Sequence, residues 1–230
     1  EDCVRAVESK KARGSLKWIR LAVNDATDLF NARISSASTI DDGDEIEWVS
    51  PLSGDDYAEY RDIDFLERLG LNLSKKPLNE FWPNLGPQWD ALGRTKAGNI
   101  ILLEAKANIP EAVSPATGAS SESKRKIESS LSETKAFLGV DPDIPWSGKL
   151  YQYTNRLAHL YLLRELNGID AHLVFTYFVG DKDVNGPNTV AEWDAALTIV
   201  KGVLGIGKRH PFSKYVSDVF VDVKEIESAA

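Results

Sequence analysis

Two acids and a lysine stand in an unusual place, near the ends of two neighbouring apolar segments. Asp90 precedes the first segment, and Glu104 and Lys106 end the second, in QWDALGRTKAGNIILLEAKANIPE from residue 88 to residue 111. Lys96-Ala97-Gly98 predicts a three-residue hairpin turn between the segments, because glycine suits the left-handed position that closes such a turn. In this register Leu92 faces Leu102, and Asp90 faces Glu104.

Opposed carboxylates on apolar strands indicate a bound cation. Directly facing residues have Cβ atoms about 4.5–5.5 Å apart, so Asp90 and Glu104 repel each other, and both also lose hydration. A hard divalent cation such as Mg²⁺, for which Mn²⁺ substitutes, relieves both costs. Lys106, two residues beyond Glu104, shares its face and can orient water or stabilise charge developing at phosphorus. The alternative is a surface ion pair of Glu104 with Lys106 beside a turn-proximal Asp90.

The other face of this hairpin is predicted to be core. It carries only apolar side chains, namely Trp89, Ala91, Ile101, Leu103, Ala105 and Ala107.

The same residues carry a family resemblance. WDALG followed by LLEAKA resembles the PD-(D/E)XK nuclease superfamily, in which an acid on one strand precedes Glu-x-Lys on the next. Asp90 matches the first acid, and Glu104, Ala105 and Lys106 match Glu-x-Lys. Trp89 departs from the usual proline before the acid. Within the superfamily, the segments around residues 88–111 and YQYTNRLAHLYLLRE look most like an uncharacterised bacterial group.

The resemblance implies further site residues. Asp90 and Glu104 would bind the metal, with the carbonyl of Ala105 as a third ligand. Gln152 and Arg156 are four residues apart on a helix and so share a face; the resemblance implies that they support the site, together with Asn155. A polar stripe on a half-exposed helix is the alternative. The superfamily also often adds an upstream acid, for which Glu67 is preferred to Glu80, and Glu111 lies within reach of the site.

The order of predicted elements gives the fold class. Apolar periodicity predicts helices over 15–34, 57–69, 122–138, 150–166 and 189–204, strands over 46–49, 171–179 and 216–223, and a proline-rich loop over 74–87. This order implies α/β layers around a mixed sheet. The resemblance sharpens this to a restriction-endonuclease-like three-layer fold, a central mixed β-sheet flanked by helices. We expect one domain over residues 1–230, with an N-terminal helical elaboration over about 1–50.

Charge and cysteine usage limit the functional classes. The 230 residues carry a net charge of −8, which argues against coating nucleic acid by charge, although a local site remains compatible. Three clusters of basic residues are predicted to be solvated faces: Lys10 to Arg20, Lys124 to Lys126, and Lys208 to His210. Cys3 is the only cysteine, which fits a cytoplasmic location, and no apolar stretch predicts a membrane span.

Three other motifs are assigned structural roles. DKDVNGPNTVAE, residues 181–192, fits a calcium-loop pattern, but a strand is predicted before it, and Thr189 with Glu192 fits a capping box. GVLGIGKR, residues 202–209, lacks the hydroxyl and the preceding strand of a phosphate-binding loop, so its glycines are predicted to end a helix. His159 is predicted to be packed and hydrogen-bonded.

The sequence therefore predicts a Mg²⁺-dependent nuclease. Its expected partner is nucleic acid, DNA in preference to RNA, and a homodimer is a further expectation. Two alternatives remain open: a non-catalytic module of the same fold that binds nucleic acid or protein, and a metal-dependent hydrolase of small phosphate compounds.

Overall fold

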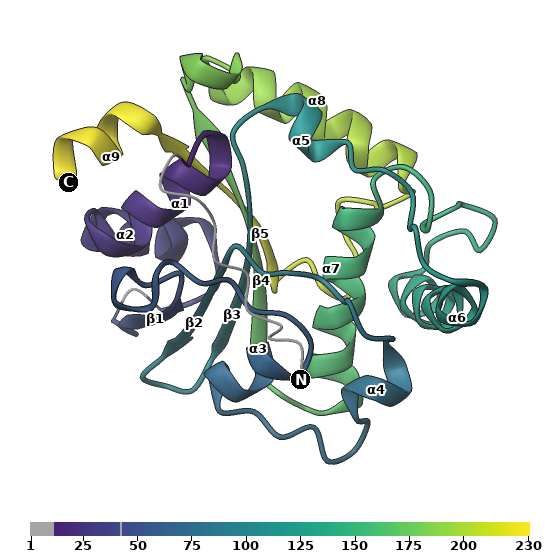
Figure 1. Cartoon of the computed structure of the whole chain (residues 1–230). Coiled ribbons are helices and arrows are strands. Elements are labelled where there is room, and N and C mark those ends of the chain that lie inside the picture. The colour runs from purple at the N-terminus through teal and green to yellow at the C-terminus, as the bar shows by residue number, and fades with distance from the viewer. Residues whose placement is uncertain (1–11, 42) are drawn as a thin grey trace.

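A five-stranded sheet forms the centre of the computed structural model, which describes residues 12–41 and 43–230 (Figure 1). Cys3, Lys10 and Lys11 lie outside the described residues. The strands are β1 Ile46–Ser50, β2 Ala91–Thr95, β3 Ile100–Lys106, β4 Ala171–Val179 and β5 Val216–Asp222, and they lie in the order β1-β2-β3-β4-β5. The first three are antiparallel, whereas β4 and β5 continue parallel to β3. The predicted α/β class with a mixed sheet flanked by helices is confirmed.

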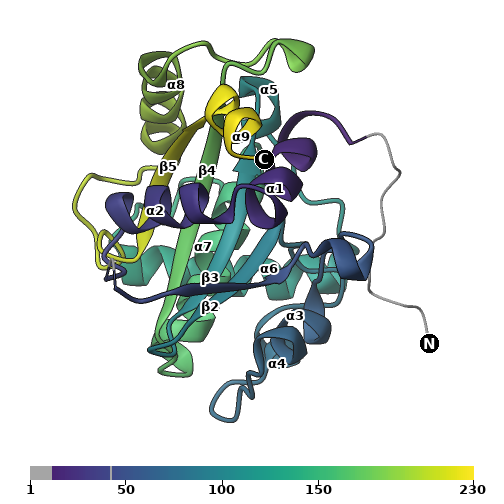
Figure 2. The ribbon, with the colours of Figure 1, turned by 90° about the vertical axis from the view of Figure 1, so that its left-hand side faces the viewer.

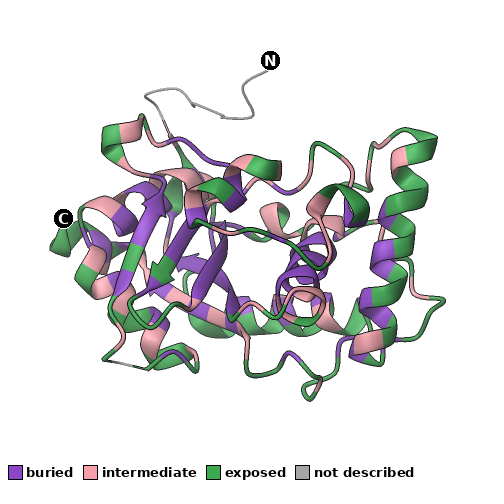
Figure 3. Cartoon of the chain, turned by 90° about the horizontal axis from the view of Figure 1, so that it is seen from below, coloured by how far each residue is buried: buried purple, intermediate pink, exposed green. Residues whose placement is uncertain are grey.

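Helices cover both faces of the sheet. The α-helices are α1 Gly14–Asn24, α2 Thr27–Ala37, α3 Asp62–Leu69, α4 Leu78–Phe81, α5 Ile109–Ala112, α6 Ser121–Leu138, α7 Tyr151–Tyr161, α8 Val190–Val203 and α9 Val223–Ala229. A π-helical turn, Leu162–Leu166, extends α7. In Figures 1 and 2, α1, α2 and α9 lie on one side of the sheet and α7 lies on the other, with α6 outside it. Seen from below in Figure 3, the strands are mainly buried and the outer helices expose one face.

Each face of the sheet has its own hydrophobic cluster. On the α1 and α2 face, Trp18 and Phe30 pack with Ile101 and Leu103. On the α7 face, helix residues pack with Leu92 and Leu102. The N-terminal helices therefore supply one of the two layers of core, because the apolar face of a sheet has to be covered.

The hairpin has the predicted register. Leu92 pairs with Leu102 and Ala91 with Leu103, and Gly98 closes the turn with a φ of 93°. The placement of Trp89 on the reverse face is wrong, because this side chain belongs to the α7-side cluster. Position 89 precedes β2 and pairs instead with Tyr60, so the alternation of the ladder does not extend to it.

Two helix predictions need correction. The helix predicted over 15–34 is two helices, because the Asn24 side chain ties the end of α1 to the segment after β1 by donating to the Pro51 carbonyl and accepting from the Ser53 amide, both at 2.8 Å. The helix predicted over 57–69 begins only at Asp62, since the Tyr60 carbonyl accepts the Trp89 amide at 3.1 Å. The short helices α4 and α5 and the C-terminal α9 were not predicted.

Other predictions agree closely with the structure. β4 matches its predicted bounds, and α6 and α8 each match within one residue. Over the described residues, no helix combines the length and apolar character that crossing a membrane requires.

Candidate active site

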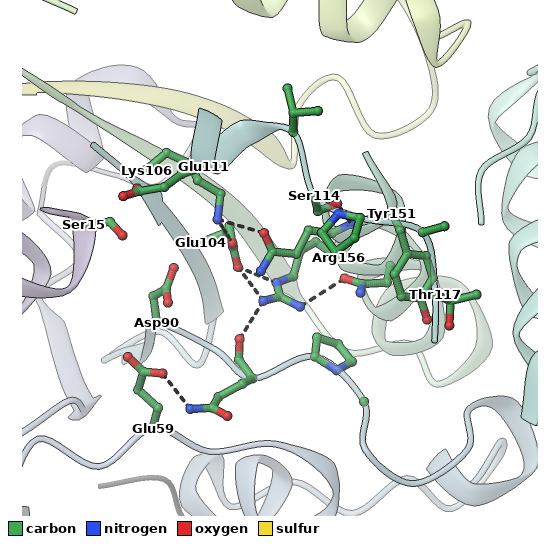
Figure 4. A pocket seen from close by; sticks show the side chains of 18 of the residues that line it. Ser15, Glu59, Asp90, Glu104, Lys106, Glu111, Ser114, Thr117, Tyr151 and Arg156 are labelled. Atoms are coloured by element: carbon green, nitrogen blue, oxygen red, sulfur yellow. Dashed lines mark hydrogen bonds and ion pairs between the residues drawn. The ribbon is translucent and has the colours of Figure 1, made fainter. Parts of the chain in front are cut away.

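Most of the predicted site residues meet in a cleft of about 700 Å³ at the carboxyl end of β3. Asp90, Glu104, Lys106, Gln152 and Arg156 all line it, and Figure 4 shows the side chains of Asp90, Glu104, Lys106 and Arg156 directed toward one another. The chain leaves β3 at Lys106 and returns along α7 to the start of β4. The first turns of α7 therefore lie beside the end of β3, which explains how residues about fifty positions apart come together.

Asp90 is fixed by the backbone of the opposing strand. Its Oδ2 accepts a hydrogen bond of 2.6 Å from the Ala105 amide. Burial, followed by the negative charges of Glu104 and Glu59, raises the pKa of Asp90 well above its usual value, and Lys106 and the Ala105 amide only partly oppose this. Asp90 is thus an acid whose ionised form is disfavoured unless positive charge arrives.

Glu104 is the most enclosed acid of the cleft, with 2% of its surface exposed. The alternative of a surface ion pair with Lys106 is therefore wrong about its location: the ion pair is present, but it is largely buried. Burial alone would raise the pKa of Glu104, but Arg156 and Lys106 outweigh it and hold the pKa below its usual value. Glu104 is consequently ionised beside an acid that resists ionisation.

Lys106 joins Glu104 to α7. Its Nζ donates to Glu104 Oε1 and, at 3.0 Å, to Gln152 Oε1. Gln152 thus lies beside Lys106 in the cleft, and its supporting role stays a prediction. The lysine side chain also lines the cleft.

Arg156 organises the buried side of the site. Its Nε donates to Glu104 Oε2 at 2.7 Å, and one terminal nitrogen donates to the Gln88 carbonyl at 2.6 Å. The other donates to Asn155 Oδ1 at 3.0 Å, and the guanidinium lies over the Trp89 ring at 4.7 Å. The alternative of a half-exposed polar stripe is wrong for Arg156, because only 3% of its side chain is exposed.

A further acid of the cleft, Glu59, was not predicted. Glu59 is buried, lines the cleft and accepts a hydrogen bond of 2.8 Å from the Gln88 side chain. It precedes Tyr60, whose pairing with Trp89 brings it beside Asp90. Its position depends on that long-range pairing, and nothing in the sequence separates it from the neighbouring Asp55 and Asp56.

The acids predicted as upstream partners lie elsewhere. Glu67 is exposed on α3 and is not among the residues that line the cleft. Glu80 is exposed and pairs with Lys76 at 3.5 Å. Glu111 does line the cleft, but its carboxylate accepts the Ala107 amide at 2.8 Å and the Asn108 side chain at 2.7 Å. Glu111 therefore closes the turn after β3.

The donor set fits a divalent cation. Burial raises the pKa of Asp90, and the negative charges of Glu104 and Glu59 raise it further; a hard cation with oxygen ligands relieves this arrangement. In the part of the chain that the structure describes, no three Asp, Glu, His or Cys side chains already converge as a ready-made cage. The Lys106 ammonium occupies Glu104 Oε1 instead, so metal binding would require Lys106 to shift toward Gln152.

The remaining motifs have the predicted structural roles. Thr189 accepts the Glu192 amide at 3.3 Å and caps α8, and Gly205, with a φ of 67°, follows the end of that helix. His159 is buried beside Trp82, and its Nδ1 lies 2.9 Å from the Asn155 carbonyl oxygen. Burial lowers the pKa of His159 to about 3, so its imidazole is neutral at physiological pH.

Comparison with known proteins identifies no relative. No family model matches the chain, and no curated protein or solved structure matches it either. The function therefore has to be argued from the cleft itself.

Proposed function

We propose that this protein is a divalent-metal-dependent phosphodiesterase that hydrolyses nucleic acid, DNA in preference to RNA, on a restriction-endonuclease-like fold. The observation that carries the proposal is that two acids, Asp90 and Glu104, line one cleft beside Lys106 at the end of the hairpin, where the charge of Glu104 acts on Asp90. Asp90 and Glu104, with the carbonyl of Ala105, would hold Mg²⁺ or Mn²⁺. The bound metal would supply an activated water and neutralise charge on the phosphate.

The side chains of the cleft would have different roles. Arg156 holds Glu104 ionised and fixed, so that this acid keeps one orientation. Lys106, released from Glu104, would orient water or stabilise charge at the phosphorus, with Gln152 retaining its ammonium nearby. Glu59 adds negative charge beside Asp90, which strengthens the attraction for a cation. A homodimer and a cytoplasmic location stay predictions from the sequence.

The test is cleavage of supercoiled, linear and single-stranded DNA, and of RNA, in Mg²⁺ or Mn²⁺ and in EDTA. We expect Glu104→Ala and Lys106→Met to abolish cleavage while circular dichroism shows a retained fold. Lys96→Met is the matched control for Lys106, because Lys96 pairs with Glu45 at the other end of the same hairpin. Full cleavage by Glu104→Ala would refute the assignment.

A wild-type protein that cuts none of these substrates is examined by titration calorimetry with Mn²⁺. Binding that Asp90→Asn removes would support the metal site and direct the search to smaller phosphodiesters. Absence of binding would favour the non-catalytic module.

A further inference from the structure

An apolar groove of about 890 Å³ lies next to the cleft. It is formed by α3, the segment 71–77, α4 and the segment 82–85. Leu85 lines the groove, and the residues that follow it, Gly86 to Gln88, line the cleft. Trp82 of the groove stacks on Tyr151 of the cleft with 6.5 Å between ring centroids. The two hollows therefore share a wall.

The groove presents apolar side chains to solvent. Leu85 is 73% exposed and Ile63 is 55% exposed. Leu85 also has a φ of 65°, a conformation that costs a leucine about 1 kcal/mol. The Asp62 carboxylate accepts the amides of Leu85 and Gly86, at 3.1 and 2.8 Å, and so maintains it. The fold thus holds an apolar side chain outward beside the cleft.

Polar groups around the groove define what would fit in it. Asn72, Asn79 and Asn84 line it, and each carboxamide offers both a donor and an acceptor. Arg61 also lines the groove, and among the described residues its buried Nε has no hydrogen-bond partner. Lys126 of α6 lies at the edge, where its ammonium donates to the Asn79 carbonyl at 2.8 Å.

This combination matches an unpaired nucleotide. A nucleobase has an apolar face and an edge of donors and acceptors, and it is read by stacking together with hydrogen bonds to that edge. The phosphate it carries is complementary to Arg61 and Lys126. An apolar peptide would use the floor of the groove but offer no charge to Arg61 and Lys126 and no partner to the carboxamides.

We infer that the groove takes an unpaired base next to the scissile phosphate, so that the substrate is a single strand or a strand with an unpaired end. The inference rests on the proposed function, because the cleft supplies the phosphate site. A base within a continuous duplex is stacked and paired on both sides and does not enter such a groove without being extruded.

The test is binding of short fluorescein-labelled single strands, as DNA and as RNA, and of the corresponding duplex DNA, measured by anisotropy in Ca²⁺. The variant is Leu85→Asn with Ile63→Asn, since asparagine tolerates the left-handed conformation. The matched control is Ile199→Asn with Val203→Asn on α8, where the exposed fractions are 68% and 59%. We expect the groove variant to bind single strands about tenfold or more weakly, because the base would lose its apolar contact with Leu85 and Ile63, and the control to bind as wild type.

Duplex bound as tightly as single strand, or a groove variant that binds as wild type, would overturn the inference. Cleavage assays separate it from the proposed function. If the groove variant loses single-strand binding and the wild-type protein cuts no substrate, the inference about the groove stands and the proposed nuclease activity fails. If the wild-type protein cuts duplex DNA and the groove variant cuts it equally well, the proposed nuclease activity stands and the inference about the groove fails.

Discussion

The two ends of the β2–β3 hairpin carry similar charged residues in opposite environments. At the turn, Arg94 pairs with Glu47 at 3.1 Å and Lys96 pairs with Glu45, and these side chains are 45% to 75% exposed. At the other end, the side chains of Glu104 and Arg156 are 2% and 3% exposed. Water screens the first group, whereas the second interacts at short range in a low-dielectric interior. Ion pairs of the same kind are thus expected to contribute little to stability at the turn end and much more at the site end.

The difference lies in what surrounds each pair. The turn end projects into solvent, while the site end is covered by α7 and by the Tyr60–Trp89 pairing. Burial makes each charge dependent on its partner, because an uncompensated buried charge is costly. This contrast leads to four predictions, from the largest effect to the smallest.

Arg156→Met should show the largest loss of stability. It leaves Glu104 buried without its main partner, and breaking a buried pair from one side typically costs about 3–5 kcal/mol. Urea denaturation monitored by tryptophan fluorescence measures the change. Adding Glu104→Gln to Arg156→Met should recover most of the lost stability, because the buried side chain at position 104 then carries no charge. A loss no larger than that of a surface variant would show that α7 does not depend on this pair.

Divalent metal should stabilise the fold through the same acids. Free Mn²⁺ at about 100 times its dissociation constant would add about 2.7 kcal/mol to the free energy of unfolding. Thermal unfolding with and without Mn²⁺ measures the effect. Asp90→Asn should abolish it, whereas Glu47→Gln at the turn end should not. An equal stabilisation of the Asp90→Asn protein would place the metal elsewhere.

Asp90→Asn should make the protein more stable at pH 8. The gain should be smaller than the loss caused by Arg156→Met. The same substitution should abolish activity. The folded pKa of Asp90 lies above the unfolded value of 3.8, so protonation favours the fold. The stability that this group contributes is complete below that value and is lost as the pH rises through the folded pKa. The difference in free energy of unfolding between Asp90→Asn and wild type should therefore shrink as the pH falls toward 3.8. A variant less stable than wild type at pH 8 would contradict the raised pKa.

Arg94→Ala and Lys96→Ala should have the smallest effects. Both side chains form exposed ion pairs, which contribute little because water and salt screen them. We expect no measurable change in the denaturation midpoint and unchanged cleavage, from the same urea and cleavage assays. A clear loss of stability or cleavage at either position would mean that burial does not explain the difference between the two ends of the hairpin.

The sequence by itself determined the hairpin and the acids on it. The alternation of apolar residues and Gly98 predict the register in which Leu92 pairs with Leu102, because that register depends on local turn geometry and on a period of two along a strand; it brings Asp90 and Glu104 to one cleft. The spacing of Gln152 and Arg156 likewise places them on one helix face. The α/β class followed from the order of strongly periodic segments.

Only the tertiary structure decided which upstream acid completes the cleft and what lies beside it. Glu59, rather than Glu67, approaches Asp90 because Tyr60 pairs with Trp89, and such a pairing between segments about thirty residues apart has no local signature. The same pairing places the Trp89 side chain on the α7 face of the sheet. The apolar groove also depends on how α3, α4 and the Leu85 segment pack together. Short-range periodicity fixes which residues share a face, but long-range packing fixes which faces meet.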